Sequence, residues 1–309
     1  PDRQAAEAIA CASLVSRSGL PDGVGIGDLV AALWFMGPDE LARYLVLAER
    51  RGGSVAAAAD VADSGAYADG GYFVAGGRDQ HGVIDCGPLG YLSIAAHGHA
   101  DCLALTVCHE GRWVLVDPGT YCYHREAAWR DHFRSTAAHN TVNVDGTSQS
   151  EMLGPFMWGR RATPEQRRWV RHERFTLFEG THDGYRALGV RRHVRTVLFS
   201  DAGYWLVVDR LEGTGEHRLE AVFQLAEGFS ESGSEGDFSG RDGRGMSVRS
   251  WLPDGMSARV ACGETDPPAG WVSRGFGHRV ASPAFKASGR IELPAVLLFG
   301  LVPFSEGKR

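Results

Sequence analysis

Apolar and polar residues alternate with a period of two along most of this chain. The runs at residues 102–108, 113–117 and 192–199 combine β-branched and aromatic residues, and turn pairs such as Glu110-Gly111 separate them. This pattern is typical of strands joined by tight turns. No long helical periodicity interrupts it, so parallel βαβ units are not expected. Further strands are predicted at 72–75, 82–85, 140–145, 204–209, 219–224, 246–249, 257–261 and 295–302.

The first fifty residues follow a different pattern. Apolar residues recur at helical spacing within 5–12, and another segment opens with proline and acids at 38–40 and ends at the glycines 52–53. Such residues mark helix boundaries. We therefore expect the last helices of a larger helical domain at 1–55 and a large antiparallel β-sandwich at 56–309. Between regular elements, the sequence predicts a linker or edge strand at 54–66 and a mobile surface loop at 228–245.

Composition narrows the class of protein. The chain has 309 residues, of which 41 are glycine, and its formal net charge is −6. A hydrophobic share of 43% excludes a disordered chain, and the acidic balance argues against a nucleic-acid-binding protein. No apolar run reaches the ~18 residues of a membrane span. The chain starts at Pro1 without a methionine, so it is expected to be an internal piece of a longer protein.

Polar residues that belong to metal chemistry stand within the predicted strands. In the segment His97-Gly98-His99-Ala100-Asp101 a strand would direct both histidines to one face. Asp117 ends an apolar run, and His139 lies in another segment expected to be buried. His99, Asp117 and His139 form a two-histidine, one-carboxylate set, which suits Zn²⁺. Spacing alone leaves open the alternative of two separately hydrogen-bonded core histidines and a turn aspartate.

The same segment allows another metal interpretation. The pattern His-x-His-x-Asp also resembles the motif of metallo-β-lactamase-like hydrolases, but Cys102 stands where that motif has a further histidine. That motif also belongs on a loop that leads into a helix, whereas residues 102–116 predict a strand, a turn and another strand. The hydrolase interpretation is therefore the weaker one.

The segment at 97–101 and four others between residues 87 and 146 together resemble the C-terminal β-sandwich portion of the heparinase II/III-like polysaccharide lyases. The similarity spans residues 65–225 and is looser elsewhere. It implies an N-terminal (α/α) toroid followed by an antiparallel β-sandwich, in agreement with the helical pattern at the start of the chain. The segments that carry it are 87–90, 97–101, 114–121, 129–142 and 144–146.

The resemblance also implies a division of roles. Zn²⁺ would be held by His99, Asp117 and His139. His97 would face the substrate groove as a catalytic base or as the group that neutralises the substrate carboxylate. Tyr121 lies four residues after Asp117 and would support the active site.

Two neighbouring residues are candidates for contact with substrate. Arg134 lies beside the predicted site residues and carries the charge that an anionic glycan requires. Trp129 could stack on a sugar, and packing in the core explains it equally well.

The implied reaction is β-elimination in a uronic-acid-containing polysaccharide, such as a glycosaminoglycan or alginate. In the family the principal tyrosine, with an asparagine or histidine, comes from the toroid, so activity is not expected without that domain. The alternative is a non-catalytic, metal-stapled sandwich that binds glycan or supports the toroid. The expected partners are an anionic polysaccharide and the chain's own upstream toroid, with a homodimer left open. A bacterial protein of the periplasm or the secreted fraction is expected.

Overall fold

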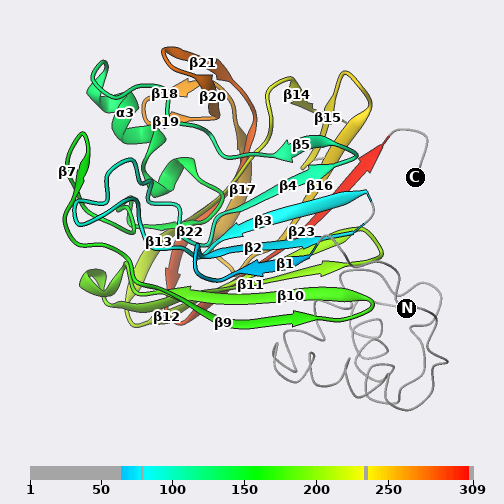
Figure 1. The fold of residues 1–309 in the computed structure, drawn as a ribbon, viewed down its shortest axis with the longest axis horizontal. Coiled ribbons are helices and arrows are strands. Elements are labelled where there is room, and N and C mark those ends of the chain that lie inside the picture. Colours follow the sequence, from blue (N-terminus) through cyan, green and yellow to red (C-terminus); the bar gives the residue numbers. More distant parts are fainter. Residues whose placement is uncertain (1–63, 78, 233–235, 306–309) are drawn as a thin grey trace. The chain divides into compact units, whose positions relative to one another are not determined.

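The computed structural model describes residues 64–77, 79–232 and 236–305. The predicted helices and the predicted domain boundary at residue 55 lie outside these ranges and stay predictions. Strands dominate the described part, and Figure 1 shows them as arrows around a few short helices. The helices are α3 (Ala127–Phe133) and the 3-10 turns η1 (Thr136–Ala138) and η2 (Arg186–Leu188).

The first sheet is an antiparallel meander in which five strands pair in sequence order. The turn between its last two strands has positive φ at Glu110 (46°) and Gly111 (76°), as a tight hairpin turn requires. Side chains alternate between the core and the outer face along these strands. The strands are β1 (Gly65–Tyr67), β2 (Tyr72–Gly76), β3 (Gln80–Asp85), β4 (Leu105–His109) and β5 (Arg112–Leu115).

The second sheet has eight antiparallel strands, and β23 lies in its interior between β16 and β12. In sheet order the strands are β14 (Phe229–Glu231), β15 (Asp237–Gly240), β16 (Arg244–Trp251), β23 (Ala295–Ser305), β12 (Tyr204–Gly213), β11 (Val190–Ser200), β10 (Phe175–His182) and β9 (Pro164–Arg171).

A third sheet has four strands, and three short hairpins complete the described elements. The four-stranded sheet has the order β17 (Met256–Ala261), β22 (Ala284–Glu292), β13 (Glu216–Gln224) and β6 (Val142–Val144). The hairpins are β7 (Met152–Gly154) with β8 (Met157–Trp158), β18 (Glu264–Thr265) with β19 (Pro268–Ala269), and β20 (Trp271–Gly275) with β21 (His278–Ala281).

One apolar core joins the three large sheets. The ring of Phe73 in β2 lies 4.8 Å from that of Phe178 in β10, and Phe223 in β13 lies 4.8 Å from Phe299 in β23. The eight-stranded sheet therefore packs against both other sheets. Burial of these aromatic rings contributes to the packing of the eight-stranded sheet against the other two sheets. The predicted antiparallel β-sandwich is confirmed.

Several local expectations need correction. Residues 228–245, expected as a mobile loop, contain β14, β15 and the start of β16. The strand expected from residue 102 begins only at Leu105, because Leu103 has φ of 65°. β10 was not predicted, since all eight of its residues are buried and no alternation marks it.

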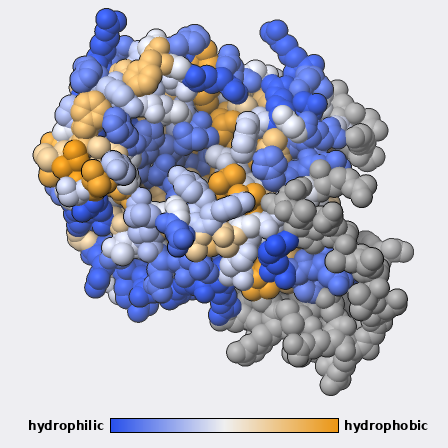
Figure 2. All heavy atoms as spheres, in the orientation of Figure 1, coloured by the Kyte–Doolittle hydropathy of each residue, from blue (hydrophilic) through white to orange (hydrophobic). Residues whose placement is uncertain are grey.

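The surface of the described part is mainly polar in the view of Figure 2, with an apolar group beside β7 at the left edge. Leu153 in β7 and Met157 in β8 are among the exposed apolar residues. Within the described residues, no helix has the length and apolar character needed to cross a membrane.

A charged network lies inside the sandwich. Arg195 donates through Nε and Nη2 to the two carboxylate oxygens of Asp209, at 2.7 and 2.8 Å, and both side chains are fully buried. His193 donates from Nε2 to Asp209 at 2.7 Å and contacts His182 Nε2 through Nδ1 at 3.0 Å. Gly184 donates its backbone N–H to His182 Nδ1. Each ring therefore accepts one hydrogen bond and donates one, in the order Gly184, His182, His193 and Asp209. Both rings are neutral in this arrangement.

This network predicts a loss of stability in mild acid. Burial lowers the pKa of His182 well below its ordinary value, and burial also lowers the pKa of His193. The unfolded chain binds protons at these rings below about pH 6.5, and the folded chain does not, so stability falls as pH falls. We expect up to about 1.4 kcal/mol per pH unit from each ring. Urea unfolding of the parent and of His182→Gln between pH 7.5 and 5 tests this. Equal pH slopes for the two proteins would contradict it.

Candidate metal centre and pocket

The connection between β3 and β4 carries His97 and His99, and it is a folded loop rather than a strand. Tyr91 and Ala96 exchange two backbone hydrogen bonds of 3.0 Å within it, and His97 has φ of 60°. Gly90 has φ of 57°, and a Cβ there would meet the carbonyl of Ala95 at 2.2 Å. The expectation that His97 and His99 share one strand face is therefore wrong, because the backbone turns at His97.

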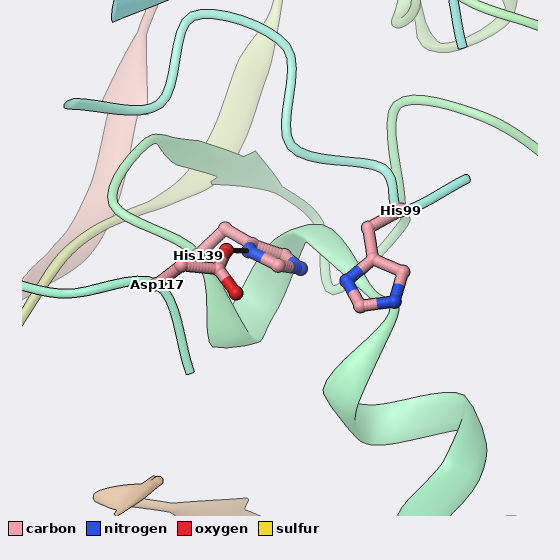
Figure 3. Close-up of side chains that lie close together, drawn as sticks. All are labelled: His99, Asp117 and His139. Atoms are coloured by element: carbon pink, nitrogen blue, oxygen red, sulfur yellow. Dashed lines mark hydrogen bonds and ion pairs between the residues drawn. The ribbon is translucent and has the colours of Figure 1, made fainter. Parts of the chain in front are cut away.

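Three segments of the chain nevertheless bring the predicted ligand set together. His99 comes from the β3–β4 loop, Asp117 follows β5, and His139 directly follows η1. One ligand atom from each of the three lies within 4.8 Å of the others. Figure 3 shows the ring of His139 between the carboxylate of Asp117 and the ring of His99.

The hydrogen bonding of His139 defines what this group can bind. Its Nδ1 lies 2.9 Å from Asp117 Oδ2, and an ionised carboxylate can only accept, so Nδ1 carries the hydrogen. Its Nε2 is buried and has no partner among the described residues, and it presents a lone pair when the ring is neutral. A buried acceptor without a donor is costly unless a cation or a hydrogen-bond donor satisfies it. A carboxylate-oriented imidazole is also the usual arrangement behind a zinc ligand.

The charge states at neutral pH also suit a cation. Burial and the neighbouring His139 lower the pKa of His99 to about 4, so its ring is neutral. Burial alone would raise the pKa of Asp117, but the charge and hydrogen bond of His139 outweigh it and hold the pKa at about 2. A neutral imidazole and an ionised carboxylate are the forms that bind metal ions. Burial alone would lower the pKa of His139, but Asp117 outweighs it and raises that pKa, so a cation would bind there in exchange for a proton.

His97 is exposed and lies at the wall of the adjoining pocket. Its Nδ1 is hydrogen-bonded to the hydroxyl of Tyr123 at 3.2 Å, and its ring lies 5.6 Å from that of Phe156. Tyr123 was missed by the sequence reasoning, which singled out Tyr121 on the same turn. The sequence shows only that a second tyrosine follows Tyr121 by two residues, and no pattern in it indicates which of the two lies beside His97.

Tyr121 is buried, and its hydroxyl donates to Glu126. The guanidinium of Arg279 lies over its ring at 4.6 Å and over that of Trp129 at 3.9 Å. Trp129 also packs edge-on against Trp271. Neither Tyr121 nor Trp129 is among the residues that line the pocket. Their placement supports a role in packing the loops around the site, and their predicted roles at the substrate stay predictions.

Arg134 follows α3 and is 6% exposed. Its guanidinium donates to Asp131 at 2.8 Å and to the carbonyl of Pro155 at 3.1 Å, and it lies over the ring of Trp158. The guanidinium is thus paired with groups of the protein itself. The structure therefore gives Arg134 the surroundings of a loop anchor, and its predicted contact with substrate stays a prediction.

A pocket of about 440 Å³ opens beside the ligand set. Its floor is the outer face of the five-stranded sheet, since Val83 and Thr106 form a cross-strand pair there, and the β3–β4 loop forms a wall. Asp85 and Asp101 also line it, and sequence reasoning did not select either as a site residue. Burial is the largest influence on both carboxyls and raises the pKa of Asp85 to about 6 and that of Asp101 to about 7.

A second hollow, also of about 440 Å³, continues from the first. The two share Thr106 and Asp117 as lining residues, so Asp117 lies at their junction. Trp113, which is 39% exposed, and Arg274 line the second hollow. Together the two hollows form a groove with Trp113 and Arg274 at one end and His97 at the other, and Arg274 is ion-paired there with Glu227 at 3.4 Å.

Comparison with known proteins identifies the family of this chain. A sequence model of the family described as "Heparinase II/III-like, C-terminal" matches residues 59–295. A heparin-sulfate lyase of Bacteroides stercoris is 23% identical over 205 residues, which cover 64% of this chain and 27% of that protein.

Solved structures show the same fold. The heparan sulfate lyase HepC from Pedobacter heparinus superposes with a TM-score of 0.63 at 18% identity, covering 97% of this chain and 43% of that one. A heparinase III structure gives a TM-score of 0.63 at 21% identity, covering 90% of this chain and 40% of that one. The chain thus spans less than half the length of each of these relatives.

Proposed function

Because the chain belongs to the heparinase II/III-like C-terminal domain family, we propose that it forms the β-sandwich half of a site that cleaves a uronic-acid-containing polysaccharide by β-elimination. The observation that carries this proposal is the exposed imidazole of His97, hydrogen-bonded to Tyr123 in the wall of a pocket beside the ligand set. The heparin-sulfate lyase and heparan sulfate lyase among the relatives act on substrates of this class.

The chemistry of β-elimination matches the groups at the pocket. A base removes the proton at C5 of the uronate, the C4–O4 bond breaks, and an acid protonates the departing O4. Histidine is suited to the first step, since its ordinary pKa lies near neutrality. With Nδ1–H donating to the oxygen of Tyr123, Nε2 of His97 carries the lone pair that accepts the C5 proton. The product keeps a C4–C5 double bond.

His97 fits a second role at the same place. The negative charge that develops next to the uronate carboxylate needs a neutralising group or hydrogen-bond donors, because it would otherwise raise the barrier. A protonated His97 could supply this. A rate that rises with pH across the neutral range would favour the base, and a rate that falls would favour the neutralising group.

We further propose that His99, Asp117 and His139 bind Zn²⁺. The support is the unpartnered Nε2 of His139, which lies between the other two side chains. When bound, zinc would supply a positive charge that joins the three segments behind the pocket. In the metal-free protein Asp117 is hydrogen-bonded to Nδ1 of His139, so joining a metal ion on Nε2 as a ligand would require its carboxylate to leave that hydrogen bond. The metallo-β-lactamase-like alternative has no support, since the motif leads into β4 and not into a helix.

The groove suggests how a glycan chain would lie. A sugar placed at His97 would continue across Asp117 towards Trp113 and Arg274. Pyranose faces stack on aromatic rings, and the guanidinium of Arg274 would exchange its ion pair with Glu227 for a carboxylate or sulfate group of the glycan. The substrate class proposed is therefore an anionic glycosaminoglycan.

The test is an ultraviolet assay for the unsaturated uronate. The protein at its full natural length is incubated with heparan sulfate and, separately, with alginate, and the absorbance of the new C4–C5 double bond is followed. We expect a rise with heparan sulfate. Binding of the glycan without any rise in absorbance would contradict the lyase proposal and favour the non-catalytic, metal-stapled sandwich.

A further inference from the structure

The three proposed ligands lie outside regular strands, so no sheet ladder fixes the distances between them. His99 is in a loop, Asp117 follows the end of β5, and His139 follows η1. A metal ion requires its ligand atoms within tenths of an ångström of fixed positions. Some other set of contacts must therefore hold the three segments in register.

Asn140 supplies one of these contacts. It is 1% exposed and directly follows His139. Its Nδ2 donates at 2.9 Å to the carbonyl of Leu105 and at 2.9 Å to that of Val116, the residue before Asp117. Its Oδ1 accepts from the backbone N–H of Gln224 at 2.6 Å. Both amide hydrogens and the carbonyl oxygen are thus used, a pattern that neither aspartate nor leucine could reproduce.

Thr136 supplies the second contact from the other side of His139. It is fully buried, and its hydroxyl donates at 2.7 Å to the carbonyl of Ala100, the residue after His99. The same oxygen accepts from the backbone N–H of Gln149 at 3.0 Å. The short segment 136–140, which contains His139, is therefore bound at one end to Ala100 beside His99 and at the other end to Val116 beside Asp117.

Asn140 is itself held from the core. Arg195 donates from Nη1 to the carbonyls of both Asn140 and Leu103, while Asp209 pairs with the rest of its guanidinium. Because this ion pair is fully buried, the carbonyl of Asn140 has little freedom to shift.

We propose that Thr136 and Asn140 are positioning residues, a two-sided clamp that sets the distances among His99, Asp117 and His139. This inference rests on the proposed metal site and adds to it the residues that give the site its geometry. Outer groups of this kind typically contribute about 10–100-fold to metal affinity.

The experiment measures zinc affinity of the folded, metal-free chain by competition with a chromophoric chelator. Thr136→Val removes the hydroxyl with little change of shape, and Thr136→Ser restores it. Thr141→Val is the matched control, since Thr141 is also fully buried and its hydroxyl donates to a carbonyl, that of Cys102, which does not adjoin a ligand. We expect zinc to bind about 10–100-fold more weakly to Thr136→Val. Thr136→Ser and Thr141→Val should bind zinc with the affinity of the parent.

The second arm compares Asn140→Ala with Asn143→Ala. Asn143 is 3% exposed and donates to the carbonyl of Thr147, away from the ligands. Circular dichroism of each metal-free variant verifies its fold, and if Asn140→Ala does not fold, the threonine series decides alone. Equal loss of affinity in the control and clamp variants, or parental affinity in Thr136→Val, overturns the clamp while leaving the metal site intact. A parent chain that binds no zinc overturns the metal site and the clamp with it.

Discussion

Replacement of His97 by alanine is expected to lower turnover of the glycan by about 10²–10⁴-fold, the usual contribution of a positioned acid or base. The ring is exposed at the pocket wall and is hydrogen-bonded to the hydroxyl of Tyr123, so stability should change little. The measurement is the rate of unsaturated uronate formation by the protein at its full natural length, together with its melting temperature.

A matched control separates chemistry from packing. His124 is also exposed and contacts the same ring of Phe156, at 5.5 Å against 5.6 Å for His97, but it does not line the pocket. His124→Ala should therefore keep parental turnover. Turnover of His97→Ala that equals the parent's would remove His97 from the mechanism, whatever the metal site does.

Removal of a proposed metal ligand should produce the second large effect, on stability. His139 is fully buried, so its loss leaves a cavity and removes its hydrogen bond to the half-exposed carboxylate of Asp117, at a cost of about 1–3 kcal/mol in the metal-free protein. Zinc at a thousand times its dissociation constant should stabilise the parent by a further ~4 kcal/mol and His139→Ala by nothing. His99→Ala and Asp117→Ala should likewise reduce stability and zinc content.

Denaturant unfolding with and without zinc, joined to elemental analysis, measures this effect. His132→Ala is the control, because His132 lies seven residues earlier on α3 and is outside the ligand set. It should keep the zinc-dependent gain. A parent protein that contains no zinc and gains no stability from it would refute the metal proposal.

The sequence was sufficient for the architecture because most strands expose one face and bury the other. Two of the segments that it misread depart from this pattern. β10 is buried along its whole length, so its residues show no alternation. The segment at 228–245 is rich in glycine, serine and acidic residues and still forms strands, because β15 pairs with β16 along one edge of the large sheet. Tertiary pairing there overrides local composition.

The ligand set was predicted through its residue types and the family resemblance, although part of the reasoning was wrong. His97 and His99 do not alternate along a strand, and the loop turns at His97. Tyr123 and the clamp residue Asn140 could not be selected, because their roles depend on contacts with residues 24–84 positions away along the chain. Such contacts leave no local pattern.

The place of β23 has a consequence for how this protein is made. Every other described strand precedes β23 in the chain, yet β23 pairs with both β12 and β16 inside the eight-stranded sheet. During synthesis from the N-terminus, β12 and β16 therefore each present an unpaired edge until residues 295–305 have been made. Unpaired edges are templates for aggregation. We therefore expect both edges to stay exposed to such pairing until the last described strand has been made.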